Sequence, residues 1–283
     1  MDYELHNLRA IAALNQRGGR MLSLVDLLDA GTLNLDMAAE MAYVAAHGGS
    51  FLTAAGPGGV GKTTLMGATL AFLPPGTEIV TIEGPETLDR LASRPADRPQ
   101  CLVVHEIGRG DYYAYLWGAA VARYFDLAMT PGRSLASNLH ACTYEEARGQ
   151  LMGELLGVSD RALGAVDLLA FMDARRGKRR VAAAWETAGN TASYRPADPP
   201  AGHRQAWRWL TQEDRFDEVR STPAAEAIAR RRGGIAPARV AGDLRRLRDF
   251  LAQAQAERVH RMEDLRGRAL AAGLFADGST SAA

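Results

Sequence analysis

The chain has 283 residues, of which 47% are hydrophobic, enough to bury a sizeable core and to exclude general disorder. Its 33 basic and 33 acidic residues give a formal net charge of zero, which argues against nucleic acid or an anionic membrane surface as the main partner. The sequence has no apolar run as long as the roughly 18 residues of a membrane span and no signal-peptide pattern at its start, so we expect a cytoplasmic protein.

The first part of the chain is predicted to be helical. Two short helices flank a break at residues 17–20. The segment 35–47 repeats apolar residues at helical spacing and stops at Gly48 and Gly49. We therefore expect a helical linker over 1–47 ahead of the main domain.

A complete phosphate-binding motif follows a short apolar strand predicted over 50–55. The expected nucleotide-binding residues are Gly56, Pro57, Gly58, Gly59, Val60, Gly61, Lys62, Thr63 and Thr64. The glycines allow backbone N–H groups to close around a phosphate, and the helix that begins at Lys62 adds its partial positive charge. Lys62 can reach the β- and γ-phosphates, and the Thr63 hydroxyl can ligate Mg²⁺.

Strands and helices alternate after this loop. Strands are predicted over 78–82, 101–104 and 135–139, a loop with at most one helical turn over 84–98, and helices over 111–127 and 143–156. Strands over 168–173 and 180–186 flank a basic turn and predict a β-hairpin. The sequence thus predicts an α/β core over 48–188.

The last part of the chain, 189–283, is expected to be a linker and a helical region. Residues 189–202 are rich in proline and small polar residues and are the best linker candidate. Thr222 and Pro223 begin a predicted helix that ends near Arg232, and 237–272 is predicted to form one long or broken helix.

Two cysteines are too few for a disulfide framework or a zinc site. Cys101 and Cys142 both lie among apolar or small residues, so we expect two buried free thiols. A reducing compartment fits this pattern.

Polar side chains end the strands that should lie beside the phosphate-binding loop. Glu83 ends the first of these strands, Glu106 follows the second, and His140 ends the third. Because the carboxyl ends of parallel strands converge on a ligand crevice, all three can face a nucleotide there. Hydrolysis needs a carboxylate that polarises water, which Glu106 or Glu83 would supply, and a neutral imidazole at His140 can sense the γ-phosphate or hold the water.

Four motifs stand in one order along the chain. They are the loop 56–63, Val80-Thr-Ile-Glu-Gly-Pro-Glu86, Val103-Val-His-Glu-Ile-Gly-Arg109 and Ser137-Asn-Leu-His140. This set resembles the Walker A, aspartate, Walker B and histidine boxes of the secretion ATPase superfamily, the traffic ATPases of type II and type IV secretion, type IV and tight-adherence pili and archaella. The resemblance extends over roughly 22–260.

The resemblance implies a RecA-like P-loop NTPase core that uses ATP and Mg²⁺. It implies that Glu106 is the catalytic glutamate, that Glu83 lies at the Mg²⁺ or the water, and that His140 senses the γ-phosphate. It also implies a hexameric ring that docks at the inner face of the cell membrane, binds a membrane platform protein and drives assembly or disassembly of a pilin-like fibre. We expect the family's N-terminal domain to be absent, since 1–30 is too short to supply it.

The chain departs from the family pattern where trans-acting arginines are usual. About twenty residues separate Glu83 from the Walker B box, fewer than the family carries, and Arg90, Arg94, Arg98 and Arg109 are the candidates that are left. An arginine finger raises turnover by orders of magnitude. The sequence therefore leaves two functions open, an ATP-driven motor and a nucleotide-binding assembly or regulatory protein with weak or no ATPase activity. A nucleic-acid-handling NTPase is disfavoured by the net charge.

Overall fold

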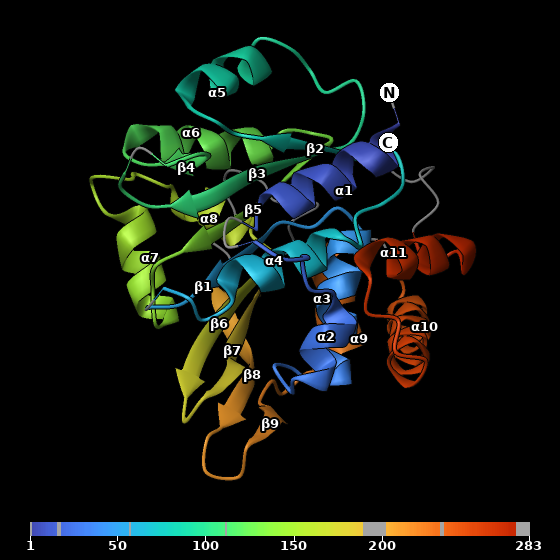
Figure 1. Cartoon of the computed structure of the whole chain (residues 1–283). Coiled ribbons are helices and arrows are strands. Elements are labelled where there is room, and N and C mark those ends of the chain that lie inside the picture. The colour runs from blue at the N-terminus through green and yellow to red at the C-terminus, as the bar shows by residue number, and fades with distance from the viewer. Residues whose placement is uncertain are drawn as a thin grey trace.

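The structure is a computed structural model that describes residues 2–15, 18–56, 58–110, 112–188, 202–232 and 235–275, and its fold is α/β (Figure 1). One nine-stranded sheet runs in the order β2 (Glu78–Thr81), β3 (Gln100–Ile107), β5 (Arg133–Leu139), β1 (Phe51–Ala54), β6 (Leu168–Arg175), β7 (Lys178–Thr187), β8 (His203–Leu210) and β9 (Arg215–Glu218). The short strand β4 (Tyr115–Leu116) pairs with the end of β3. Pairing is parallel from β2 to β6 and antiparallel from β6 to β9.

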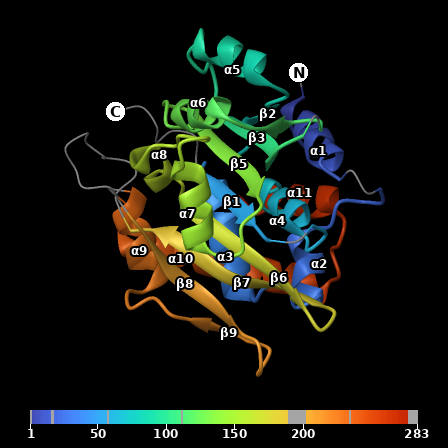
Figure 2. The same cartoon turned by 90° about the vertical axis from the view of Figure 1, so that its left-hand side faces the viewer.

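Helices cover both faces of the sheet (Figure 2). One face packs against α1 (Tyr3–Ala13), α2 (Leu24–Asp29), α3 (Leu35–Ala46), α4 (Lys62–Leu70), α9 (Ala224–Arg232), α10 (Pro237–Ala256) and α11 (Met262–Ala271). The other packs against α5 (Pro85–Ala92), α6 (Ala119–Ala128), α7 (Tyr144–Met152) and α8 (Asp160–Gly164). The central strands β1, β3 and β5 are buried along almost their whole length because helices cover both faces of the sheet.

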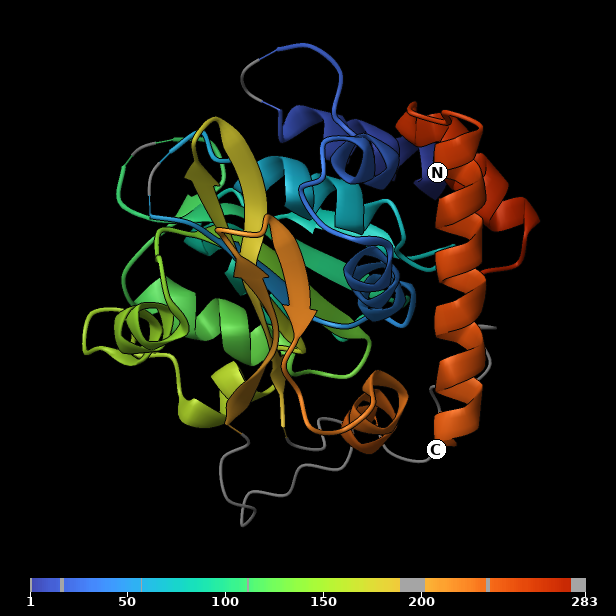
Figure 3. The ribbon, with the colours of Figure 1, turned by 90° about the horizontal axis from the view of Figure 1, so that it is seen from below.

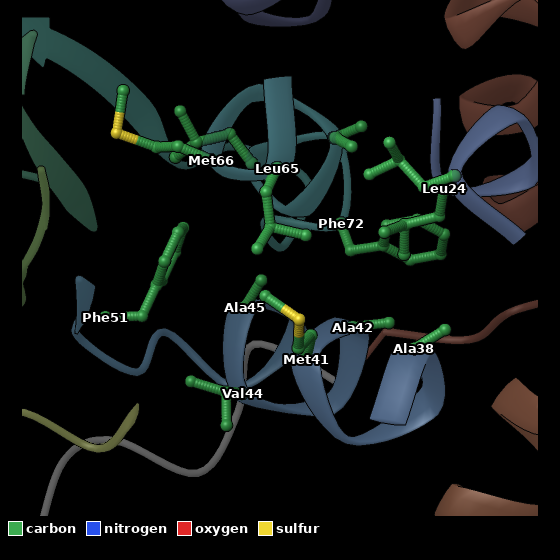
Figure 4. Packing of buried hydrophobic residues seen from close by; sticks show 14 of the residues in the cluster. Leu24, Ala38, Met41, Ala42, Val44, Ala45, Phe51, Leu65, Met66 and Phe72 are labelled. Atoms are coloured by element: carbon green, nitrogen blue, oxygen red, sulfur yellow. The ribbon is translucent and has the colours of Figure 1, made fainter. Parts of the chain in front are cut away.

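The strand period of two divides the core into two clusters. Phe51 and Val103 face the cluster of α1 to α4, whereas Leu52 and Val104 face the cluster of α5 to α8. Figure 4 shows the first cluster from close by, with Phe51 beside side chains of α3 and α4. This packing fixes the start of α4, where the phosphate-binding motif ends.

The predicted strands 50–55, 78–82, 101–104, 135–139, 168–173 and 180–186 are confirmed, as are the helices at 35–47 and 222–232. The long C-terminal helix is broken into α10 and α11, and α10 stands along one side of the molecule (Figure 3). Arg258, which lies between them, has a left-handed backbone with φ 55°, and this conformation ends a right-handed helix. The expected linker falls mostly outside the described residues.

Three expectations were wrong. The segment 84–98 contains the eight-residue helix α5 rather than a loop, because Pro85 suits a first helical position. The expected helix over 111–127 begins only at Ala119, after β4. Strands β8 and β9 lie in the part of the chain where only a linker and helices were expected, and they extend the core sheet. The division into domains stays a prediction.

A buried ion cluster ties α3 to the antiparallel half of the sheet. The Arg220 side chain is 0% exposed, and its guanidinium pairs with Glu40 of α3, with Glu186 of β7 at 3.2 Å and with Glu218 of β9 at 2.6 Å. The Trp207 indole N–H also donates to Glu40 at 3.2 Å. Burial raises the pKa of Glu40 to about 7 against the opposing effect of Arg220. Removing the arginine would leave the buried Glu40 carboxylate without its cation, whereas Glu186 would keep its ion pair with Arg204 at 3.1 Å.

Candidate functional site

The phosphate-binding loop joins the end of β1 to the start of α4. Gly59 and Gly61 adopt left-handed backbone conformations with φ 81° and 111°, which side-chain-bearing residues rarely adopt. A Cβ at Gly61 would also lie 3.2 Å from the Met172 methyl carbon of β6. The left-handed backbone and the nearby Met172 methyl group therefore both favour glycine at position 61. Pro57 lies outside the described residues.

The structure brings together Lys62, Glu106 and His140, which come from three separate elements. The Lys62 ammonium lies 3.1 Å from a Glu106 carboxylate oxygen and 3.2 Å from His140 Nδ1. His140 Nε2 lies 3.2 Å from the same Glu106 oxygen. The side chains of Lys62 and Glu106 are 7% and 6% exposed, whereas that of His140 is 48% exposed. The cluster therefore joins a largely desolvated ion pair to an accessible imidazole.

The two hydrogen-bond partners of His140 Nδ1 require different tautomers. Nδ1 can accept from the Lys62 ammonium at 3.2 Å, or it can carry a proton and donate to the Gly56 carbonyl at 3.0 Å. In a neutral imidazole of the first kind the proton is on Nε2, which lies 3.2 Å from the Glu106 oxygen. His140 therefore contacts both the phosphate-binding loop and the carboxylate.

A β-bulge places Glu106 in this cluster. Val104 pairs with Ser137 and Ile107 with Leu139, so that His105 and Glu106 together oppose the single residue Asn138. A bulge bends its strand and re-aims a side chain, and bulges are common beside active sites. Glu106 was expected just after a strand, but it lies inside β3, and the bulge accounts for its position.

Two site residues were missed from the sequence. Asn138 is fully buried, and its amide N–H groups donate to the Thr63 hydroxyl at 3.1 Å and to the His105 carbonyl at 2.6 Å. Tyr115 of β4 lies opposite Glu106 in register, and burial together with the Glu106 carboxylate raises the pKa of the Tyr115 hydroxyl. Asn138 lies inside the motif 137–140, but nothing in the sequence alone indicates that its side chain connects two strands to the phosphate-binding loop.

Glu83 is not brought into the cluster. It is exposed after β2, and it accepts a hydrogen bond from the Tyr113 hydroxyl at 3.0 Å. Two strands, β3 and β5, lie between β2 and β1. Three strand spacings of about 4.8 Å separate the axes of β2 and β1 by roughly 14 Å. Glu106 is thus the carboxylate that contacts the lysine of the phosphate-binding loop.

Two of the four candidate arginines, Arg94 and Arg98, lie beside the starts of the parallel strands. Arg133, at the start of β5, donates to the Arg94 carbonyl at 2.8 Å. The Arg98 guanidinium lies 4.3 Å from the centre of the Tyr3 ring, and the Arg98 carbonyl lies beside Gly132, which precedes β5. Arg94 and Arg98 therefore lie at the amino-terminal ends of the parallel strands, at the opposite end of these strands from the phosphate-binding loop.

The two other arginines are also engaged. Arg90 of α5 donates to the Thr87 hydroxyl at 3.2 Å. Arg109 follows the carboxyl-terminal end of β3, where its guanidinium lies 5.3 Å from the centre of a Trp117 ring. Of the four candidates, Arg109 is the one that follows the end of a core strand on the side of the loop.

The metal-binding potential of the site rests on hydroxyl and carboxylate oxygens. Within the described residues there is no group of three or more histidine, cysteine or acidic side chains that could hold a metal ion. Mg²⁺ needs only one or two protein oxygens when a nucleotide supplies phosphates, and the Thr63 hydroxyl in the first turn of α4 fits that requirement.

The cysteine prediction was half right. Cys101 is buried, and burial raises the pKa of its thiol to about 12. Cys142 is exposed rather than buried, because it follows the end of β5 beside the phosphate-binding loop. A Cβ at Gly56 would lie 2.2 Å from the Cys142 sulfur, so the first glycine of the loop is needed for this close approach.

The described helices include none that is both long enough and apolar enough to span a membrane. No protein-family model and no curated protein sequence matches the chain. A search of solved structures finds similarity to the X-ray structure of the Legionella pneumophila ATPase DotB, with a TM-score of 0.34 and 12% identity. The match covers 85% of this chain and 66% of that one, which is under two thirds of its length. A TM-score this low establishes no shared fold, so the function has to be argued from the site itself.

Proposed function

We propose that the chain is a Mg²⁺-dependent ATPase with a RecA-like P-loop core. The observation that carries the proposal is the meeting of Lys62, Glu106 and His140 within 3.2 Å, beside a loop of phosphate-binding sequence. The loop motif supplies phosphate binding, and the other two residues are the polar groups that hydrolysis needs next to it.

Each residue has a chemical part in this proposal. Lys62 leaves its ion pair with Glu106 when its ammonium contacts the β- and γ-phosphates, and Glu106 is then free to accept a proton from water. His140 is close enough to both to report whether a γ-phosphate is present. Thr63 is the residue that would hold Mg²⁺, which neutralises charge on the phosphates when it is bound.

The finer proposal is a motor of a secretion or pilus-type assembly machine. It rests on the order of the four motifs along the chain, and it includes a hexameric ring, a cytoplasmic position at the inner face of the membrane and a membrane platform protein as partner. In such a ring, ATP turnover would move one subunit against the next.

The alternative is a nucleotide-switched assembly or regulatory protein with slow turnover. A specific observation favours it, because the guanidinium groups of Arg98 and Arg109 lie over aromatic rings of their own chain. A trans-acting arginine would have to leave such a contact to reach a neighbouring site. The two functions share one nucleotide site and differ in the rate of hydrolysis.

Lys62→Ala is expected to weaken ATP binding roughly 10- to 100-fold, because it removes a charged donor to the phosphates. Lys178→Ala is a matched control, since this lysine forms an ion pair with Asp214 at 2.6 Å in the hairpin. Calorimetric titration with ATP measures both affinities. An unaltered affinity in Lys62→Ala would refute the assignment of the site.

The motor and the switch are separated by the ATPase rate measured against protein concentration, with molecular mass measured in parallel. A motor with shared sites should show specific activity that rises steeply as the ring assembles. A monomer with constant specific activity would exclude the motor and leave the switch.

A further inference from the structure

A buried amide connects three elements of the site. Asn138 lies in the central parallel strand β5 and is 0% exposed, although asparagine is depleted in strands and burying an amide is costly unless it is hydrogen-bonded. Its oxygen accepts a hydrogen bond from the Thr53 hydroxyl of β1, which is its direct partner in register. Its nitrogen donates to Thr63 of α4 and to the His105 carbonyl of β3.

The bond to His105 acts at the β-bulge. Asn138 is the single residue that faces His105 and Glu106, where the regular ladder between β3 and β5 is interrupted. The amide donates to the His105 carbonyl at 2.6 Å and so satisfies a backbone group at this interruption. The residue after that carbonyl is Glu106, so the amide holds the backbone from which the carboxylate projects.

The bond to Thr63 fixes a hydroxyl rotor. A threonine oxygen has two lone pairs and one proton, and the Asn138 N–H at 3.1 Å occupies one lone pair. The second lone pair and the proton are thereby confined to the remaining directions around the oxygen. A hydroxyl held in this way is pre-oriented for a cation, which lowers the entropic cost of binding that cation.

We infer that Asn138 is a positioning residue that orients the Thr63 hydroxyl for Mg²⁺ and holds the bulge that carries Glu106. Its contribution is to couple Mg²⁺ binding to nucleotide binding, and it touches neither ligand itself. The inference rests on the proposed function, since it requires that the loop bind a nucleotide together with Mg²⁺.

The test measures binding and not turnover, with ADP as the probe and the full chain as the protein. ADP affinity is measured by calorimetry in Mg²⁺ and in EDTA, and the ratio of the two dissociation constants gives the coupling. Wild-type protein should bind ADP more tightly in Mg²⁺. In Asn138→Leu this ratio should be about 5- to 10-fold smaller, the change expected for the loss of one hydrogen bond. The affinity for ADP in EDTA should be unchanged.

Two further variants make the result specific. Ser137→Ala removes a neighbouring buried hydroxyl that donates to the Asn138 carbonyl at 3.2 Å, and it should leave the coupling unchanged. Thr63→Val should abolish the coupling, and adding Asn138→Leu to it should change nothing more, because the two residues act in series. If the leucine variant does not fold, Asn138→Ser takes its place. This smaller change keeps a hydroxyl donor and should give a partial loss of the coupling.

Each outcome is decisive. Loss of coupling with retained affinity in EDTA supports the inference. Unchanged coupling, or a parallel fall of both affinities in a folded variant, overturns it while leaving the nucleotide site in place. Wild-type protein that binds no ADP in either condition overturns the proposed function, and the role of Asn138 with it.

Discussion

Replacing Glu106 by glutamine is expected to lower the ATPase rate roughly 100- to 10,000-fold, the range that a general base contributes. The amide keeps the shape of the side chain but cannot take a proton from water. ATP affinity should be retained or tightened, because Lys62 no longer has an anionic partner at 3.1 Å that competes with the phosphates. Single-turnover hydrolysis and calorimetric ATP titration measure the two effects separately.

Glu83→Gln is the matched control for this experiment. Glu83 was predicted to act at the Mg²⁺ or the water, yet it is exposed and accepts its hydrogen bond from Tyr113. The structure therefore predicts a much smaller effect on hydrolysis than at Glu106. Equal turnover in Glu106→Gln and wild type would move the catalytic base elsewhere, and a large loss in Glu83→Gln would point to this residue instead.

Arg220→Ala is expected to destabilise the fold by about 3–5 kcal/mol, the cost of removing one partner from a buried ion pair. The substitution leaves the carboxylates of Glu40 and Glu186 in the interior without the guanidinium between them. Urea denaturation measures the change. Arg208→Ala is the control, because its pair with Asp217 is 53% and 29% exposed and such pairs contribute about 0–1 kcal/mol.

The loss in Arg220→Ala should be larger at pH 8 than at pH 6. Burial already raises the pKa of Glu40 to about 7, above that of an unfolded glutamate, so its contribution to stability is complete at low pH and is lost as pH rises through about 7. Without Arg220 the pKa rises further, and the variant goes on losing stability at a pH where wild type has stopped. A loss that is the same at both pH values would show that Glu40 does not titrate in this range.

The meeting of Lys62, Glu106 and His140 could be expected from the sequence because strong local patterns mark these residues. A glycine-rich loop between a strand and a helix identifies Lys62, and polar residues at the ends of apolar strands identify Glu106 and His140. The parallel sheet then brings these ends together, as its topology requires. These inferences needed no knowledge of the order of strands in the sheet.

The rest depended on information that local patterns do not carry. Glu83 ends a strand just as Glu106 does, but its strand lies at the sheet edge, and strand order is set by packing over long sequence separations. Asn138 is one of several polar residues in its strand, and its importance is visible only when the bulge opposite it is seen. The alternation of Trp207, Arg208 and Trp209 was a strand signal, but it was too short to be recognised beside an expected linker.

Strand β6 connects the parallel and the antiparallel parts of the sheet. One of its edges is bonded in parallel to β1, which leads into the phosphate-binding loop, and the other is bonded antiparallel to β7. A force applied at the outer strands β8 and β9 therefore reaches the loop across a continuous hydrogen-bonded ladder. The Arg220 ion cluster adds a second connection, through α3, to the same half of the molecule. The antiparallel strands and the strand that leads into the phosphate-binding loop thus belong to one hydrogen-bonded sheet.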